Sequence, residues 1–159
     1  MSSYRSKYDS AFVNGTPNFA GTFTAQEERG RQIFTGAGRC DGCHNTDAHI
    51  SGNVFNNGLD ATITDVGAGG GRFKAPSLRN IAVRAPYMHD GRFATLRDVI
   101  EHYDHGVQAS PNLAPALTDN TGAPRRLNLT EADKLALLAF LGTLTDSAMM
   151  QDVKFSNPF

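Results

Sequence analysis

The sequence predicts an all-α fold. Three segments, residues 24–35, 95–104 and 130–145, each open with a threonine suited to cap a helix and continue with apolar residues at helical spacing. No segment shows a convincing apolar–polar alternation of the kind that marks a half-buried strand. The connections are long and rich in glycine, proline and asparagine, so we expect helices joined by extended loops.

The composition limits the class of protein. The chain has 159 residues, and 40% of them are hydrophobic, a fraction too high for a disordered chain. Its formal net charge of −1 lacks the positive excess expected of a nucleic-acid-binding protein. The longest apolar run, residues 135–141, is far shorter than the about 20 residues that span a bilayer, so we expect no membrane span. Two cysteines cannot build a disulfide scaffold. One soluble globular domain with tails is expected.

The chain divides into three parts. Residues 1–23 mix serine, tyrosine, asparagine, glycine and proline without a period, so we expect an irregular arm or linker there, with no export signal. Residues 24–146 contain the three helices and form the domain. Residues 147–159 are expected to form a C-terminal tail.

The first helix begins at a capping box formed by Thr24 and Glu27. Ile33 and Phe34 give it a narrow contact face, and Gly30 on that face lets another backbone approach closely. Glycines at positions 36 and 38 end the helix directly before the two cysteines.

The other two helices each show one apolar face. In the second helix, which Thr95 and Asp98 begin and Gly106 ends, the face consists of Leu96, Val99, Ile100 and Tyr103. In the third helix, which Thr130 caps, it consists of Leu137, Phe140, Leu141 and Leu144.

Residues 40–44 carry the chemistry. They read Cys-Asp-Gly-Cys-His, a C-x-x-C-H motif of the kind that attaches c-type haem. Two thiols three residues apart can reach both vinyl groups of one porphyrin, and His44 then lies beneath the ring with its imidazole on the iron. A thioredoxin-like dithiol needs a βαβ context, which is not visible. A zinc site needs two more ligands, for which Asp47 and His49 are the nearest candidates. We therefore favour one covalently bound haem c, anchored by Cys40, Cys43 and His44.

Three further segments carry a family resemblance. Residues 76–80 (PSLRN), 86–91 (PYMHDG) and 95–96 (TL) resemble the bacterial di-haem cytochrome c peroxidase and MauG-like family, over about residues 4–146. The chain looks like the second, C-terminal half of that family, and the first half with its peroxidatic haem is absent. The resemblance implies a cytochrome c fold, with residues 24–146 as the cytochrome c domain, long loops around the haem, and Gly30, Phe34 and Phe140 at the crossing of the first and last helices.

The resemblance also bears on the sixth iron ligand. Counting from His89 in the family's register reaches Tyr103, which implies a His44/Tyr103 pair. Met88 is the alternative, because thioether is the common sixth ligand of cytochromes c. A histidine, at position 89, 102 or 105, or an open site remains a further alternative.

Other residues receive weaker expectations. Arg79 is expected to neutralise a haem propionate, and His49 to be exposed. The family holds a calcium ion between its halves through backbone carbonyls, which here would belong to Arg84 and Pro86. With one half missing, that calcium site would be incomplete.

The function that follows is electron transfer. The domain is expected to relay electrons between a redox partner protein and a second haem centre, in the periplasm or another exported location, and a homodimer is an additional expectation. The alternative is a haem peroxidase or MauG-like oxidase acting on hydrogen peroxide, alone or with a partner chain. A haem-based sensor, with the loop of residues 46–72 as its changing element, is a third.

Overall fold

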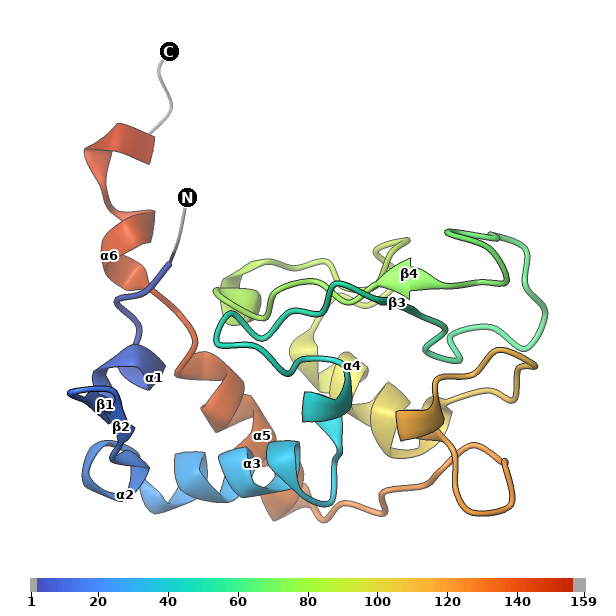
Figure 1. Ribbon diagram of the computed structural model, residues 1–159, viewed down its shortest axis with the longest axis horizontal. Helices are drawn as coiled ribbons and strands as arrows, with labels where there is room; N and C mark the ends of the chain where they lie inside the picture. The colour runs from blue at the N-terminus through green and yellow to red at the C-terminus, as the bar shows by residue number, and fades with distance from the viewer. Residues whose placement is uncertain (1–2, 156–159) are drawn as a thin grey trace.

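A computed structural model describes residues 3–155 of the chain. Two helices lie against each other along one side of the molecule, and long loops form the opposite side (Figure 1). The helices are α1 (Lys7–Ser10), α2 (Phe19–Thr22), α3 (Ala25–Thr35), α4 (Leu96–Glu101), α5 (Glu131–Gly142) and α6 (Ser147–Met150). Short 3₁₀ turns lie at Cys40–Gly42, Ile81–Val83, Pro115–Leu117 and Val153–Phe155, and a π-helical turn at His102–Gly106. Within the described residues, no helix has both the length and the apolar character needed to cross a membrane.

The three expected helices are confirmed as α3, α4 and α5. Each begins at a complete capping box, in which the threonine oxygen accepts from a backbone N–H and an acidic side chain reaches back: Thr24 with Glu27, Thr95 with Asp98, and Thr130 with Asp133. The middle helix differs from the expectation, because its α-helical part ends at Glu101 and continues as the π-helical turn.

The core lies where α3 crosses α5. Gly30 faces the backbone of Ala136 so closely that a β-carbon has no room. This approach buries a set of apolar side chains from both helices and from the residue two positions beyond α5, namely Ile33, Phe34, Leu137, Phe140, Leu141 and Leu144. Ile33 and Phe34 are buried, so the expected contact face of the first helix is confirmed, and Phe140 and Leu144 on the face expected for the third helix are almost fully buried as well.

From Ser3 onward the N-terminal segment packs against the core, where an irregular arm was expected. It contains α1 and α2, and its Ala11 and Phe23 belong to the core. The backbone N–H of Tyr8 donates to the carbonyl of Thr143 beyond α5 at 3.0 Å. Buried Arg79 holds the segment from the other side, with its guanidinium 2.7 Å from the Asp9 carboxylate.

Residues 3–155 contain four short strands, which corrects the expectation of a fold without strands. β1 (Phe12–Val13) pairs with β2 (Thr16–Pro17), and β3 (Val54–Phe55) pairs with β4 (Phe73–Lys74), both antiparallel. The first pair turns through Asn14 and Gly15, both at positive φ, an Asn-Gly signal present in the sequence. Strands of two residues are too short to show alternation, which is why the pattern failed to reveal them.

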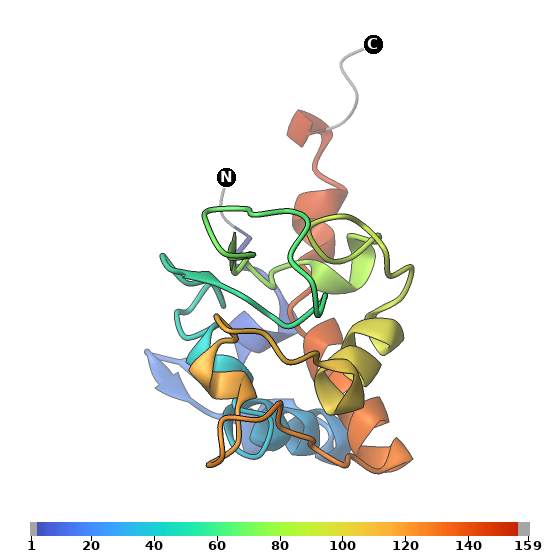
Figure 2. The same cartoon turned by 90° about the vertical axis from the view of Figure 1, so that its right-hand side faces the viewer.

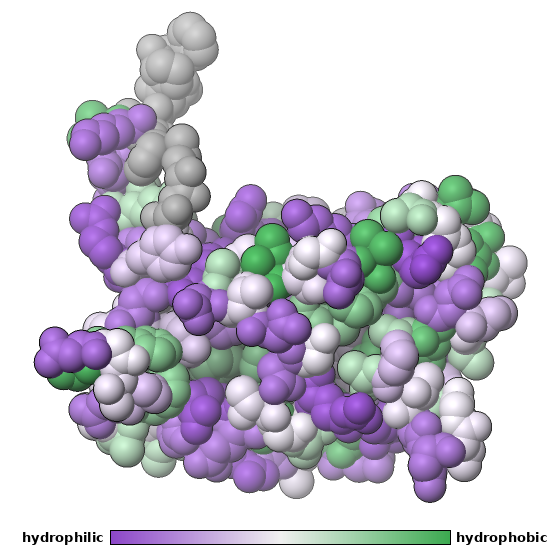
Figure 3. All heavy atoms as spheres, in the orientation of Figure 1, coloured by the Kyte–Doolittle hydropathy of each residue, from purple (hydrophilic) through white to green (hydrophobic). Residues whose placement is uncertain are grey.

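The segment after α5 also has structure. Asp146 is buried and caps α6 through the Met149 backbone N–H at 2.9 Å, and it accepts the Arg5 backbone N–H at 3.0 Å. From there α6 extends away from the rest of the molecule (Figure 2). On the face seen in Figure 3, hydrophobic residues over the loops are interspersed with hydrophilic ones.

The helix crossing makes a prediction about two glycines. We expect Gly30→Ala to lower the free energy of unfolding by about 1–3 kcal/mol, because its methyl group must push the Ala136 backbone away. Gly142→Ala is the matched control on α5, where a β-carbon meets nothing within 4 Å, and should stabilise by about 0.5–1 kcal/mol. Chemical denaturation of the holoprotein measures both, and equal effects would contradict the close crossing.

The packing of the N-terminal segment makes a prediction about two arginines. Arg79→Leu leaves the largely buried Asp9 carboxylate without a counter-charge, so we expect a loss of about 3 kcal/mol in unfolding free energy. Arg29→Leu is the matched control, because the Arg29 side chain is 58% exposed beside Asp133. We expect it to lower the free energy of unfolding by less than about 1 kcal/mol. Denaturation curves of both variants test this, and similar losses would show that the Arg79 pair does not hold the segment.

Candidate functional site

One tight turn carries both cysteines and the histidine of the motif. Beyond α3, the Gly38 N–H donates to the carbonyl of Ile33 at 2.7 Å, and Arg39 adopts a left-handed backbone with φ of 52°. The chain then closes a turn in which the His44 N–H donates to the Cys40 carbonyl at 3.0 Å. Both thiols and the imidazole therefore lie on a single half-buried turn fixed to the end of α3.

The two thiols are protonated at neutral pH. Burial, assisted by the Asp41 charge, raises the pKa of Cys40 to about 12, and burial also raises the pKa of Cys43. A redox-active dithiol needs the opposite, a lowered thiol pKa. Among residues 3–155, the His, Cys, Asp and Glu side chains that lie close enough together to hold a metal ion are Glu101, Asp104 and His105. Neither cysteine belongs to this group, so the structure does not support a zinc site at the motif.

His44 is a neutral imidazole held by backbone carbonyls. Its Nδ1 lies 2.9 Å from the carbonyl oxygen of His49. Burial lowers the pKa of His44, which keeps the ring neutral, although hydrogen bonds to the carbonyls of His49 and Pro76 act in the opposite direction. A neutral imidazole whose Nδ1 contacts a backbone carbonyl is the arrangement typical of a metal-binding histidine.

His49 is buried, which corrects the expectation of an exposed residue. Its ring packs 4.8 Å from Tyr8, 5.9 Å from Phe34 and 6.3 Å from Phe140, measured between centroids. Burial, together with the Arg79 charge, lowers the pKa of His49 to about 4. Its backbone carbonyl thus reaches His44 from a rigid aromatic cluster, a role that the loop sequence does not indicate.

Tyr103 lies on the π-helical turn His102–Gly106. Burial raises the pKa of Tyr103 to about 12, and Cys40 and Cys43 make smaller contributions in the same direction. Single π-helical turns within helices are frequent at functional sites. The structure thus places the three motif residues on one turn, and ligation of iron by Tyr103 stays a prediction.

Met88 contacts Asn57. The Asn57 amide nitrogen lies 3.4 Å from the Met88 sulfur. The Asn57 side chain also offsets part of the rise in the pKa of Tyr103 that burial causes. Met88 itself has a φ of 73°, a conformation rare for residues other than glycine. Sequence reasoning missed Asn57, because nothing in a long polar loop marks which amide will contact the site.

The three histidines considered as alternative ligands all have other partners. His102 Nε2 lies 3.0 Å from the Asn57 carbonyl oxygen. His89 stacks on Phe73 at 3.7 Å between centroids, and its Nε2 lies 3.8 Å from the Asp65 carboxylate.

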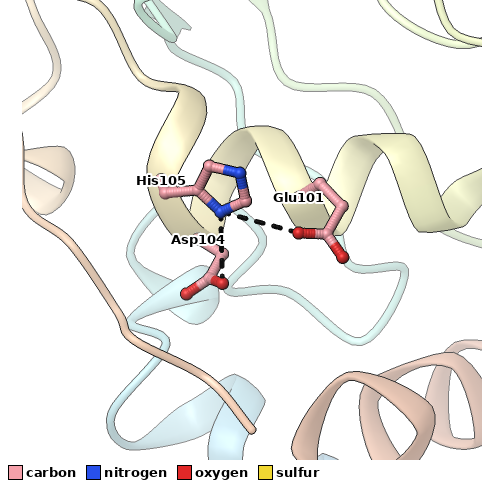
Figure 4. A group of neighbouring side chains, drawn as sticks. All are labelled: Glu101, Asp104 and His105. Atoms are coloured by element: carbon pink, nitrogen blue, oxygen red, sulfur yellow. Dashed lines mark hydrogen bonds and ion pairs between the residues drawn. The ribbon is translucent and has the colours of Figure 1, made fainter. Parts of the chain in front are cut away.

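His105 belongs to a surface cluster with Glu101 and Asp104 (Figure 4). Its Nδ1 lies 3.5 Å from the Glu101 carboxylate and 3.4 Å from that of Asp104. The Lys134 amine, 2.6 Å from Glu101 and 2.9 Å from Asp104, already supplies a positive charge to both carboxylates. The cluster thus acts as an ion-pair network that links α5 to the turn carrying Tyr103.

Two expectations stay predictions. The Arg79 guanidinium donates to Ser6 at 3.1 Å and to the Asp47 carbonyl at 2.6 Å besides its ion pair, so the structure gives it protein partners, and its contact with a propionate is untested. Calcium binding through the carbonyls of Arg84 and Pro86 is also untested; both residues are exposed.

The donor set fits a c-type haem. Two thiols on one turn can form thioethers, and the imidazole adjacent to them is neutral, with its Nδ1 at a backbone carbonyl. Haem supplies a ferric/ferrous iron couple when it is bound in such a site.

Comparison with known proteins agrees with this chemistry. The family model "Cytochrome c" matches residues 27–145. The methylamine utilization protein MauG of Methylorubrum extorquens is 32% identical over 130 residues, covering 76% of this chain and 35% of that protein. The cytochrome-c peroxidase IdrP2 of Denitromonas iodatirespirans is 30% identical over 158 residues, covering 77% of this chain and 40% of that protein. The chain thus spans well under half the length of these curated relatives.

Solved structures show the same fold. A MauG-like protein associated with microbial copper homeostasis superposes with a TM-score of 0.74 at 32% identity, over 98% of this chain and 56% of that one. The diheme peroxidase BthA of Burkholderia thailandensis superposes with a TM-score of 0.67 at 23% identity, over 91% and 47%, which supports the fold alone. The chain belongs to the cytochrome c family and is a member of its MauG-like di-haem peroxidase group.

Proposed function

We propose that this chain is a one-haem electron-transfer domain. Cys40 and Cys43 would hold the haem through two thioether bonds, and His44 and Tyr103 would be the residues that bind its iron. The observation that carries the proposal is the single turn on which the His44 N–H donates to the Cys40 carbonyl at 3.0 Å and the His44 Nδ1 lies 2.9 Å from the His49 carbonyl oxygen. Iron bound by two protein residues would exchange electrons without an open position for a substrate.

The surroundings of the site also favour electron transfer over peroxide chemistry. Peroxide activation needs an open iron position and a nearby group that moves a proton. His102 is bonded to the Asn57 carbonyl, and His89 is stacked on Phe73 and paired with Asp65. Neither imidazole is free for that role in this chain.

The proposal extends to partners and location. The electron would pass to a second haem centre, on a preceding domain or a separate redox protein, or on a second copy of this chain. Covalent haem attachment takes place outside the bacterial cytoplasmic membrane, so we propose a periplasmic or otherwise exported location. Calcium at the carbonyls of Arg84 and Pro86 would belong to the contact with that second domain.

Hydrogen peroxide distinguishes a carrier from an enzyme. We expect the reduced holoprotein, mixed with peroxide and an electron donor, to show slow bleaching of the Soret band without saturable turnover, because both axial positions are filled. Stopped-flow absorbance with varied peroxide measures this. The double variant Tyr103→Ala/Met88→Ala, which removes both candidate ligands on that side, is the control and should react faster. Rapid saturable turnover by the unaltered chain would instead establish the peroxidase or MauG-like oxidase reading.

The ligand assignment has its own test. A phenolate is a hard donor that favours ferric iron, so Tyr103→Phe should raise the midpoint potential by roughly 0.1 V or more, a fraction of the about 0.8 V range that axial ligands command. The ferric spectrum of the unaltered protein should lack the far-red sulfur-to-iron band, and Met88→Leu should leave that spectrum unchanged. A far-red band that is present and survives Tyr103→Phe would assign the iron to Met88.

A further inference from the structure

We propose that Arg125 is a positioning residue of the haem site, whose guanidinium holds the turn that carries the motif and places a fixed positive charge near the Cys40 sulfur, where it favours ferrous iron. The inference rests on the proposed attachment of haem through Cys40 and Cys43 and adds a residue that sets the midpoint potential. Arg125 Nη2 donates to the Gly38 carbonyl at 2.8 Å, across 87 positions of the chain.

Gly38 is in direct contact with the motif. A β-carbon at this glycine would lie 3.1 Å from the Cys40 sulfur, and the Gly38 N–H donates to the Ile33 carbonyl at 2.7 Å. The glycine thus joins the sulfur to the end of α3. An arginine held on the Gly38 carbonyl therefore lies close to the sulfur that the motif would use for attachment.

The loop that carries Arg125 also packs against the motif at a second point. A β-carbon at Gly42 would lie 3.2 Å from the Ala116 β-carbon, so the 3₁₀ turn Pro115–Leu117 contacts the residue between the two cysteines. The Arg125 N–H donates to the Leu117 carbonyl at 2.8 Å, which closes the loop between them. Arg125 is therefore held at its backbone as well as at its guanidinium.

The chain does not neutralise the charge of Arg125. Among residues 3–155, no carboxylate forms an ion pair with this half-buried arginine, and its Nε is buried without a hydrogen-bond partner. An arginine is effectively always protonated, and a partly buried charge is screened less than an exposed one. Because oxidation adds a positive charge to the iron, a cation held near the site disfavours the ferric state.

Two substitutions separate the charge from the hydrogen bond in the haem-loaded full chain. Arg125→Gln keeps an N–H donor for the Gly38 carbonyl and removes the charge, whereas Arg125→Lys keeps the charge and loses the planar fork. We expect Arg125→Gln to shift the ferric/ferrous equilibrium about tenfold toward the ferric state, a fall of about 59 mV in midpoint potential for one electron. Arg125→Lys should retain most of the original potential. Potentiometric titration followed by visible absorbance measures both.

Arg125→Met is a second uncharged variant, which should lower the potential by a similar amount, and either uncharged variant alone carries the test. Arg72→Gln is the matched control, because Arg72 is exposed and likewise donates to a glycine carbonyl, that of Gly69 at 2.8 Å. It should leave the potential unchanged.

The proposal is overturned if the uncharged variants keep the potential of the unaltered protein, if Arg125→Lys loses as much as they do, or if Arg72→Gln causes an equal shift. Release of haem from the unaltered chain on denaturation would instead contradict the attachment through Cys40 and Cys43, and the proposed function would fail with it. The two failures are thus separated, because the first appears only in the variants and the second in the unaltered protein.

Discussion

The close crossing of α3 and α5 at Gly30 is the constraint on which the rest of the structure depends. The missing side chain lets the two backbones meet at Ala136, and this contact sets the distance over which Phe34 and Phe140 pack at 5.2 Å between centroids. Because the Cys40–Gly42 turn follows α3 after four residues, its position is fixed by the same crossing. A displaced α3 would move both thiols and His44 together relative to the elements that carry Tyr103 and Met88.

The side opposite the crossing is held by polar rather than apolar contacts. Asp104 accepts the Leu129 N–H at 2.9 Å and pairs with Lys134, which fastens the π-helical turn to the beginning of α5. Asn56 joins the loop beyond β3 to the segment after the π-helical turn, because its amide donates to the Ser110 hydroxyl. Buried polar groups of this kind specify one conformation, because each alternative leaves a donor or acceptor without a partner. A small haem domain can therefore position ligands on loops without a second apolar core.

Features made by residues close together in the sequence could be predicted from it, and features made by residues far apart could not. The capping boxes at Thr24, Thr95 and Thr130 and the motif at residues 40–44 each lie within a few residues, and three helices and the haem-anchoring turn follow from them. The buried state of His49 and the contacts of Asn57 depend on residues tens of positions away, so no pattern in the loops indicates them. The packing of the N-terminal segment was missed for the same reason, because the ion pair that holds it joins Asp9 to Arg79, 70 positions further along the chain.

In the proposed site, the loop that carries His49 would act on the iron through His44. Donation from Nδ1 to the His49 carbonyl makes the imidazole more electron-rich, which would favour ferric iron. The carbonyl is neutral and the His49 ring beside it is packed against Tyr8, Phe34 and Phe140, so this effect would not change with pH near neutrality. The potential of the domain would then depend on the loop at residue 49 as well as on the axial ligands, because that loop adjusts the ligand it touches without replacing it.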